Sequence, residues 1–156
     1  MKATCPLNFL TGKWYTYQHN PNLRMYPNAA NISNEKVIFK ELSYQLGGLF
    51  FKIHNDLGRF RREFQYCHYF EELLKEANLA YAREHALPSI DQAQNRVDFM
   101  IENSILVDFK AKPFVTKEDY YQMQRYLGLA KKELGLIVNF RQVYLKPRRI
   151  LNTLLV

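Results

Sequence analysis

The segment from Arg96 to Lys110 reads RVDFMIENSILVDFK and constrains the fold more than any other part of the chain. Two runs of Val, Ile, Phe, Leu and Met flank a polar turn, and such runs are typical of central strands buried on both faces. Asp98, Asp108 and Lys110 interrupt these runs. A buried charge is costly unless it is paired or binds a metal. The segment therefore predicts a buried hairpin whose charged residues have specific partners.

The length of the turn decides whether the two aspartates can meet. A two-residue turn would put Asp98 and Asp108 on opposite faces of the hairpin. A three-residue turn, which pairs Ile101 with Ile105, puts the two aspartates opposite each other on one face. We predict the three-residue turn, because only this register allows one shared site.

The rest of the chain predicts an α/β fold in a single domain. With 156 residues, of which 47% are hydrophobic, the chain can build a full core. Apolar residues at three- and four-residue steps predict helices over residues 34–57, 59–78 and 117–134, with Gly135 ending the last one. Strands are expected at 79–87, in the hairpin, at 136–140 and, as a short edge strand, at 143–145. This order favours a central mixed sheet flanked by helices.

Residues 1–33 are predicted to be an N-terminal extension that precedes a domain at 34–156. They are irregular and contain Lys2, Lys13 and Arg24 but no acidic residue. Much of the net charge of +7 therefore lies outside the domain, which is only mildly basic. The extension is expected to pack on the domain or to be partly disordered, or else to contact nucleic acid through its basic and aromatic residues.

The two cysteines, Cys5 and Cys67, have no metal-binding or disulfide spacing. This usage fits a reducing, cytoplasmic setting. No apolar run approaches the roughly 18 residues of a membrane helix. The N-terminus also lacks the apolar segment of a signal peptide, so we expect no association with a membrane.

The second helix is predicted to carry functional side chains at its start. It is expected to bury Phe60 and Phe64 and to project Glu63 toward its apolar side. Arg59, Arg61 and Arg62 crowd the same end, where positive charge opposes the helix dipole. They form either a solvated basic turn or a phosphate-binding element beside Glu63.

Asp108 and Lys110 are two residues apart on a strand and therefore share a face. A carboxylate suits a hard cation such as Mg²⁺, and an ammonium can polarise an attacking water or balance charge on a phosphate. Asp98 and Glu63 can add further carboxylates, which together suit metal-assisted phosphodiester hydrolysis. A structural ion pair of Lys110 with either aspartate explains the same residues, and the pattern alone leaves this choice open.

Several short motifs follow one another between Leu42 and Ile150. They are His54-Asn55-Asp56-Leu57-Gly58, Glu63-Phe64-Gln65-Tyr66, Arg96-Val97-Asp98, Asp108-Phe109-Lys110-Ala111, Gln122 with Tyr126-Leu127, and Gly135-Leu136-Ile137-Val138-Asn139-Phe140. In this order they resemble the GxxExxY family of the PD-(D/E)xK nuclease superfamily. Gln122 and Tyr126 also resemble the QxxxY element of its exonuclease-type branch. Two positions depart from the family pattern, Phe60 where Gly is usual and Asp108 where Glu is usual.

The resemblance implies a restriction-endonuclease-like core and a role for each matching residue. Asp98, Asp108 and Glu63 would be the metal ligands for Mg²⁺ or Mn²⁺. Lys110 would position the nucleophilic water and stabilise charge in the transition state. Gln122 would orient the site or the substrate, and Tyr66 and Tyr126 would support it.

The function expected from the resemblance is Mg²⁺-dependent hydrolysis of phosphodiester bonds in DNA, by attack of a metal-activated water. The alternative is a protein that keeps the nuclease fold without catalysis and serves as a nucleic-acid-binding or assembly module.

Overall fold

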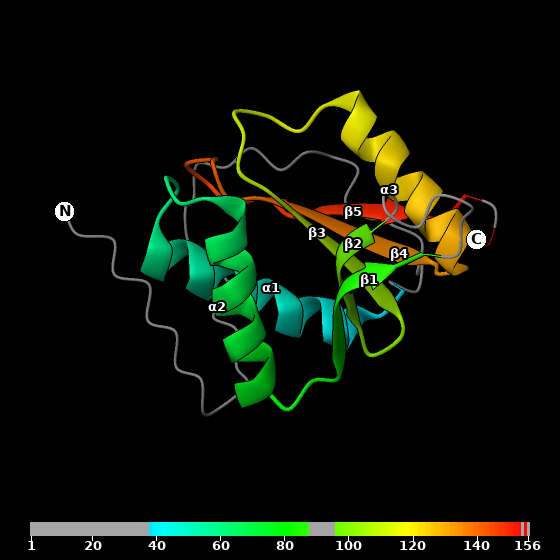
Figure 1. The fold of residues 1–156 in the computed structure, drawn as a ribbon, viewed down its shortest axis with the longest axis horizontal. Helices are drawn as coiled ribbons and strands as arrows, with labels where there is room; N and C mark the ends of the chain where they lie inside the picture. The colour runs from blue at the N-terminus through cyan, green and yellow to red at the C-terminus, as the bar shows by residue number, and fades with distance from the viewer. Residues whose placement is uncertain (1–37, 88–95, 154, 156) are drawn as a thin grey trace, which may run out of the picture. The chain divides into compact units, whose positions relative to one another are not determined.

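The computed structural model describes residues 38–87, 96–153 and 155 (Figure 1). The predicted extension at 1–33 lies outside these residues, so its role and its boundary with the domain stay predictions. The elements are α1 (Lys40–Leu57), α2 (Glu63–Glu76), β1 (Tyr81–Ala86), β2 (Arg96–Ile101), β3 (Ile105–Lys110), α3 (Lys117–Ala130), β4 (Leu134–Asn139) and β5 (Arg148–Leu151). None of the helices in these ranges is long and apolar enough to cross a membrane.

The five strands form one mixed sheet in the order β1-β2-β3-β4-β5, in which only β3 and β4 are parallel. Side chains of α1 and α2 pack with Val107 and Phe109 of β3 on one face. Side chains of α3 pack with Leu106 of β3 and Ile137 of β4 on the other. The predicted mixed sheet flanked by helices is therefore confirmed (Figure 1).

The β2–β3 hairpin has the predicted register. Ile101 pairs with Ile105, and the pairing continues to Phe99 opposite Val107. The turn is compact because Glu102 and Asn103 both adopt positive φ angles of 49°, as in the turns that match the twist of a hairpin. The polar sequence of the turn, with Asn able to adopt this backbone conformation, is what favours it.

The first two helices begin later than predicted. α1 begins at Lys40, and the predicted start at residue 34 lies outside the described residues. α2 begins at Glu63 rather than at Arg59 or Phe60, because Arg62 has an extended backbone and its N–H donates to the Gln65 side chain. The prediction that Phe60 and Phe64 are buried is wrong. Phe60 precedes the helix, and the buried side of α2 consists of Tyr66, Cys67, Phe70, Leu73 and Leu74.

The third helix begins as predicted but ends earlier. Thr116 is its N-cap residue, and α3 stops at Ala130 because Lys131 adopts a positive φ of 52°. Gly135 therefore belongs to β4 and does not end the helix. Its function is close packing, since a Cβ at this position would lie 2.4 Å from Sδ of Met123 on α3. The predicted strand at 143–145 is also wrong, because the edge strand that pairs with β4 is Arg148–Leu151.

The start of α3 is stabilised by a buried carboxylate. Asp119 accepts hydrogen bonds from the Thr116 N–H at 2.7 Å and from Nζ of Lys112 at 2.7 Å. Burial raises the pKa of Asp119, but Lys112 and the Thr116 N–H outweigh burial, and the net pKa is lowered. The folded protein therefore holds this proton less tightly than the unfolded chain does.

Asp119→Ala is expected to lower the free energy of unfolding at pH 7 by about 1–3 kcal/mol, because α3 loses its cap and Lys112 loses its partner. The lowered pKa means that this stabilisation is present above the ordinary aspartate pKa and is lost as the pH falls through the folded pKa. Urea unfolding at pH 7 and pH 3 tests both points. An equal difference between the two proteins at both pH values would contradict the pKa argument.

Candidate active site

The candidate site lies where β2 and β3 stop pairing. Their recorded pairing ends at Phe99 and Val107, so Asp98 is the first residue beyond it. The carboxylate of Asp98 accepts a hydrogen bond from the backbone N–H of Phe109 at 2.7 Å. Because Phe109 lies between Asp108 and Lys110, this bond holds Asp98 beside the D-x-K segment that was predicted to share its site.

A chain of polar contacts runs from β3 to α3. Nζ of Lys110 lies 2.7 Å from Oδ2 of Asp108 and donates to Oε1 of Gln122 at 3.3 Å. Nε2 of Gln122 in turn donates to the hydroxyl of Tyr126 at 2.9 Å. Asp108 and Tyr126 are buried, and Lys110 is partly exposed. The shared face of Asp108 and Lys110 and the pairing of Gln122 with Tyr126 are thus seen directly.

Burial sets the charge state of the site. It raises the pKa of Asp98 to about 7, with further repulsion from Asp108. Burial also raises the pKa of Asp108, and the nearby Lys110 offsets only part of this. Burial acts to lower the pKa of Lys110, but the carboxylates of Asp108 and Glu63 outweigh it and the pKa is raised. The site therefore has a firmly protonated lysine beside carboxyl groups that repel one another.

Glu63 reaches the site from the other face of the sheet. It is the first residue of α2 and shares with Asp98, Cys67 and Arg83 a cavity of about 140 Å³. Although Glu63 is exposed as a residue, desolvation in this cavity raises its pKa, while Lys110 acts in the opposite direction. Glu63 and Asp98 are therefore brought to one cavity, whereas Gln122 and Tyr126 contact the D-x-K segment from the α3 side.

The donor types fit a hard divalent cation, although the described residues contain no preformed cluster of three His, Cys, Asp or Glu side chains that could hold a metal. Lys110 contacts Oδ2 of Asp108, and the Phe109 N–H contacts Oδ2 of Asp98. One carboxylate oxygen of each aspartate is outside these two contacts. A cation would relieve the mutual repulsion that raises the pKa of these groups, and oxygen ligands are those that Mg²⁺ prefers.

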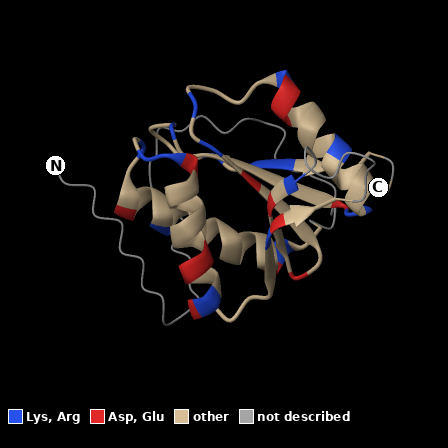
Figure 2. Cartoon of the chain, in the orientation of Figure 1, with Lys and Arg blue, Asp and Glu red and all other residues tan. Residues whose placement is uncertain are grey.

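The three predicted basic residues lie on the turn between α1 and α2. Figure 2 shows basic segments in this turn next to the acidic start of α2. The turn is held by Tyr66, whose hydroxyl donates to the Gly58 carbonyl at 2.8 Å and accepts from the Arg61 N–H at 3.1 Å. Tyr66 is fully buried and stacks on Phe140, so it braces the turn rather than reaching a ligand.

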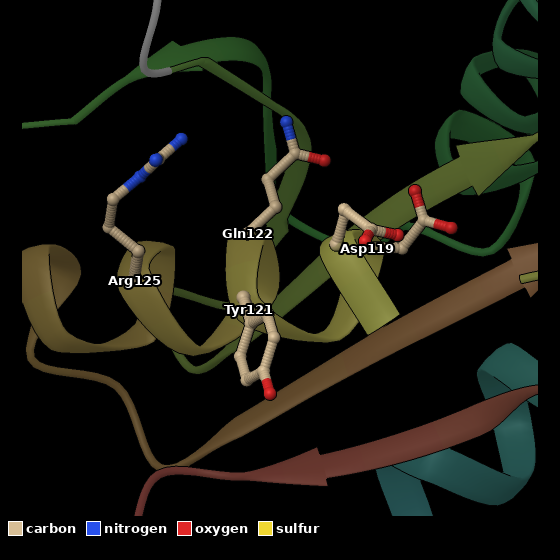
Figure 3. A pocket seen from close by; sticks show the side chains of 5 residues that line it. Asp119, Tyr121, Gln122 and Arg125 are labelled. Carbon is tan, nitrogen blue, oxygen red and sulfur yellow. The ribbon is translucent and has the colours of Figure 1, made fainter. Parts of the chain in front are cut away.

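A second wall, on the outer side of α3, is formed by Glu118, Asp119, Tyr121, Gln122 and Arg125 around a pocket of about 380 Å³. Figure 3 shows Gln122 and Arg125 extending to the same side of the helix, whereas Tyr121 points away from them. Gln122 therefore lies between this pocket and Lys110. Arg125 was not predicted, and its spacing of three residues from Gln122 on a helix is the signal that could have indicated it.

Sequence reasoning also missed the residues that join the ends of β3 and β4. Asn139 is only 2% exposed, and its side chain accepts from the N–H groups of Lys112 and Arg141 and donates to the Lys112 carbonyl. Arg141 donates to the Ala111 carbonyl at 3.1 Å. The signal was an asparagine within an otherwise apolar strand, which indicates a specific partner when it is buried.

The comparisons with known proteins agree with this arrangement. Residues 40–150 match the family model described as the PD-(D/E)XK nuclease superfamily, which covers every element from α1 to β4 and most of β5. No curated protein and no solved structure matches the chain. The mixed sheet flanked by helices is consistent with a restriction-endonuclease-like core, and the chain belongs to the PD-(D/E)XK nuclease superfamily.

Proposed function

We propose that this chain is a Mg²⁺-dependent nuclease of the GxxExxY type that hydrolyses phosphodiester bonds in DNA. The observation that carries the proposal is the position of Lys110, which contacts both the buried Asp108 and Gln122. Asp98 lies beside them at the end of the β2–β3 pairing. A purely structural ion pair needs neither the second carboxylate nor the glutamine, and both add to the cost of burial.

Each residue then has a task in hydrolysis. A bound Mg²⁺ would lower the pKa of an attacking water and neutralise charge on the phosphate. Asp98 and Asp108 would hold the cation, with Glu63 orienting it from the start of α2. Lys110, kept as an ammonium by its raised pKa, would donate to the attacking water or to a phosphate oxygen as negative charge develops. Gln122 would hold the ammonium in place through the 3.3 Å contact.

A second candidate is a binding or assembly module that has kept the fold without cleavage. Two observations favour it, the 2.7 Å contact between Asp108 and Lys110 and the lack of a three-ligand cluster among the described residues. A lysine that neutralises the aspartate can substitute for a metal in balancing charge. This module would bind nucleic acid equally well with Mg²⁺ and with EDTA.

The two functions are separated by incubating end-labelled single- and double-stranded DNA, and matched RNA, with the full chain. The proposed function predicts cleavage of DNA with Mg²⁺ or Mn²⁺ and none with EDTA, while binding is measured in parallel by fluorescence anisotropy. Binding without cleavage in both metals would favour the module. Cleavage of RNA but not of DNA would keep the nuclease and reject DNA as its substrate.

A further inference from the structure

The turn between α1 and α2 presents a large aromatic side chain to solvent. Phe60 is 73% exposed, although the sequence pattern predicted its burial. The guanidinium carbons of Arg59 and Arg141 lie 4.9 Å and 5.6 Å from the centre of its ring. An exposed aromatic held by cations is an uncommon surface feature, and it is positioned here by the buried Tyr66 that braces the turn.

Positive charge surrounds this ring. We call Arg59, Phe60, Arg61, Arg62 and Arg141 the Phe60 patch. Within the described part of the chain, no carboxylate lies within ion-pair distance of these four arginines, whereas Arg83 and Arg96 each have a glutamate partner. Nε of Arg141 is buried and has no hydrogen-bond partner among the described residues. The patch therefore has unmatched positive charge that an anionic ligand would neutralise.

The patch adjoins the candidate active site. Glu63 follows Arg62 directly, and Phe64, which is 60% exposed, lines the same cavity as Glu63 and Asp98. Arg141 is anchored to the Ala111 carbonyl, one residue after Lys110. A nucleic acid strand that contacts the patch would therefore pass beside the proposed catalytic residues.

We propose that the Phe60 patch binds a single-stranded segment of nucleic acid, with an unpaired base stacked on Phe60 and phosphates on its arginines. In a duplex the base faces are stacked on one another, so only an unpaired base can cover the ring. The arginines neutralise phosphates of either form, and the aromatic ring adds the preference for the single strand. The proposal rests on the proposed nuclease function for the class of ligand, but it concerns binding and can be tested without cleavage.

The test measures binding by fluorescence anisotropy in EDTA, with a thymidine oligonucleotide, an abasic strand of equal length and a duplex. Wild type is expected to bind the thymidine strand about tenfold more tightly than the abasic strand, the effect of about one stacked base. Phe60→Ala is expected to lose this preference, and Phe60→Tyr to keep it. Phe51→Ala, which removes another exposed aromatic of the domain, and Lys131→Gln, which removes a distant charge, are the matched controls.

Arg59→Gln is expected to weaken binding to the thymidine and abasic strands alike and to lower the salt dependence of binding by about 0.7 per phosphate contact. Tighter binding of wild type to duplex than to single strand, equal affinity of Phe60→Ala and wild type, or no binding to any nucleic acid would overturn the proposal. Stacking-dependent binding without cleavage in Mg²⁺ would support it while rejecting the proposed enzymatic function. The two claims therefore fail separately.

Discussion

Lys110→Met is expected to reduce Mg²⁺-dependent cleavage by about 100- to 1000-fold, the usual cost of removing one donor that stabilises transition-state charge. Methionine keeps the length of the side chain and its apolar contacts but removes the ammonium that contacts Asp108 and Gln122. Single-turnover cleavage at saturating Mg²⁺ measures the effect on chemistry. We expect the variant to remain folded, because Asp108 can become protonated when its partner is removed.

Lys112→Met is the matched control for this variant. Lys112 also contacts a buried aspartate, Asp119, at 2.6 Å, so both variants leave an aspartate without its cation. The control is expected to lose stability but to keep cleavage within about threefold of wild type, because the lost ion pair is typically worth a few kcal/mol of folding and not of transition-state binding. Equal losses of cleavage in the two variants would contradict the role of Lys110.

Asp98→Asn is expected to raise the melting temperature of the metal-free protein at pH 8 by about 10 °C while abolishing cleavage. Burial raises the pKa of Asp98 from its ordinary value of 3.8 to about 7. The folded protein therefore binds this proton more tightly than the unfolded chain does. The resulting stability is fully present below the ordinary pKa and is lost as the pH rises through about 7. Asparagine mimics the protonated form and can still accept the hydrogen bond from the Phe109 N–H.

The measurement is the difference in melting temperature between Asp98→Asn and wild type, in EDTA, from pH 4 to pH 9. The difference should be near zero at pH 4 and should grow until pH 8. Asp56→Asn is the control of opposite sign, because the contacts of Asp56 with Lys52 and Tyr69 lower its pKa. Added Mg²⁺ should raise the melting temperature of wild type but not of Asp98→Asn. A variant that is less stable than wild type at pH 8 would contradict the electrostatic account.

The hairpin could be predicted from sequence because its constraints are local. The apolar runs, the polar turn and the period of two leave few registers, and only the pairing of Ile101 with Ile105 puts Asp98 and Asp108 on one face. The N-cap at Thr116 could be predicted for the same reason, since capping depends on a short sequence pattern. Features that depend on neighbouring residues were therefore correct.

Features that depend on tertiary contacts were less predictable. Phe60 fits an apolar stripe in the sequence, yet the turn held by Tyr66 places it outside α2 and in solvent. Lys131 ends α3 with a positive φ that its sequence does not favour, so Gly135 was assigned to the wrong element. Arg141 and Asn139 could not be connected with the site until the parallel pairing of β3 and β4 brought their loops together.

The most direct test of the account is the dependence of cleavage on Mg²⁺ concentration for wild type and Asp108→Ala. Asp108 joins the proposed cation to Lys110, so its loss should remove both metal binding and the position of the ammonium. We predict saturable cleavage by wild type that EDTA abolishes, and a loss of at least about 1000-fold in Asp108→Ala at every Mg²⁺ concentration. Cleavage that persists in Asp108→Ala, or a wild type that cleaves no substrate with Mg²⁺ or Mn²⁺, would contradict the account.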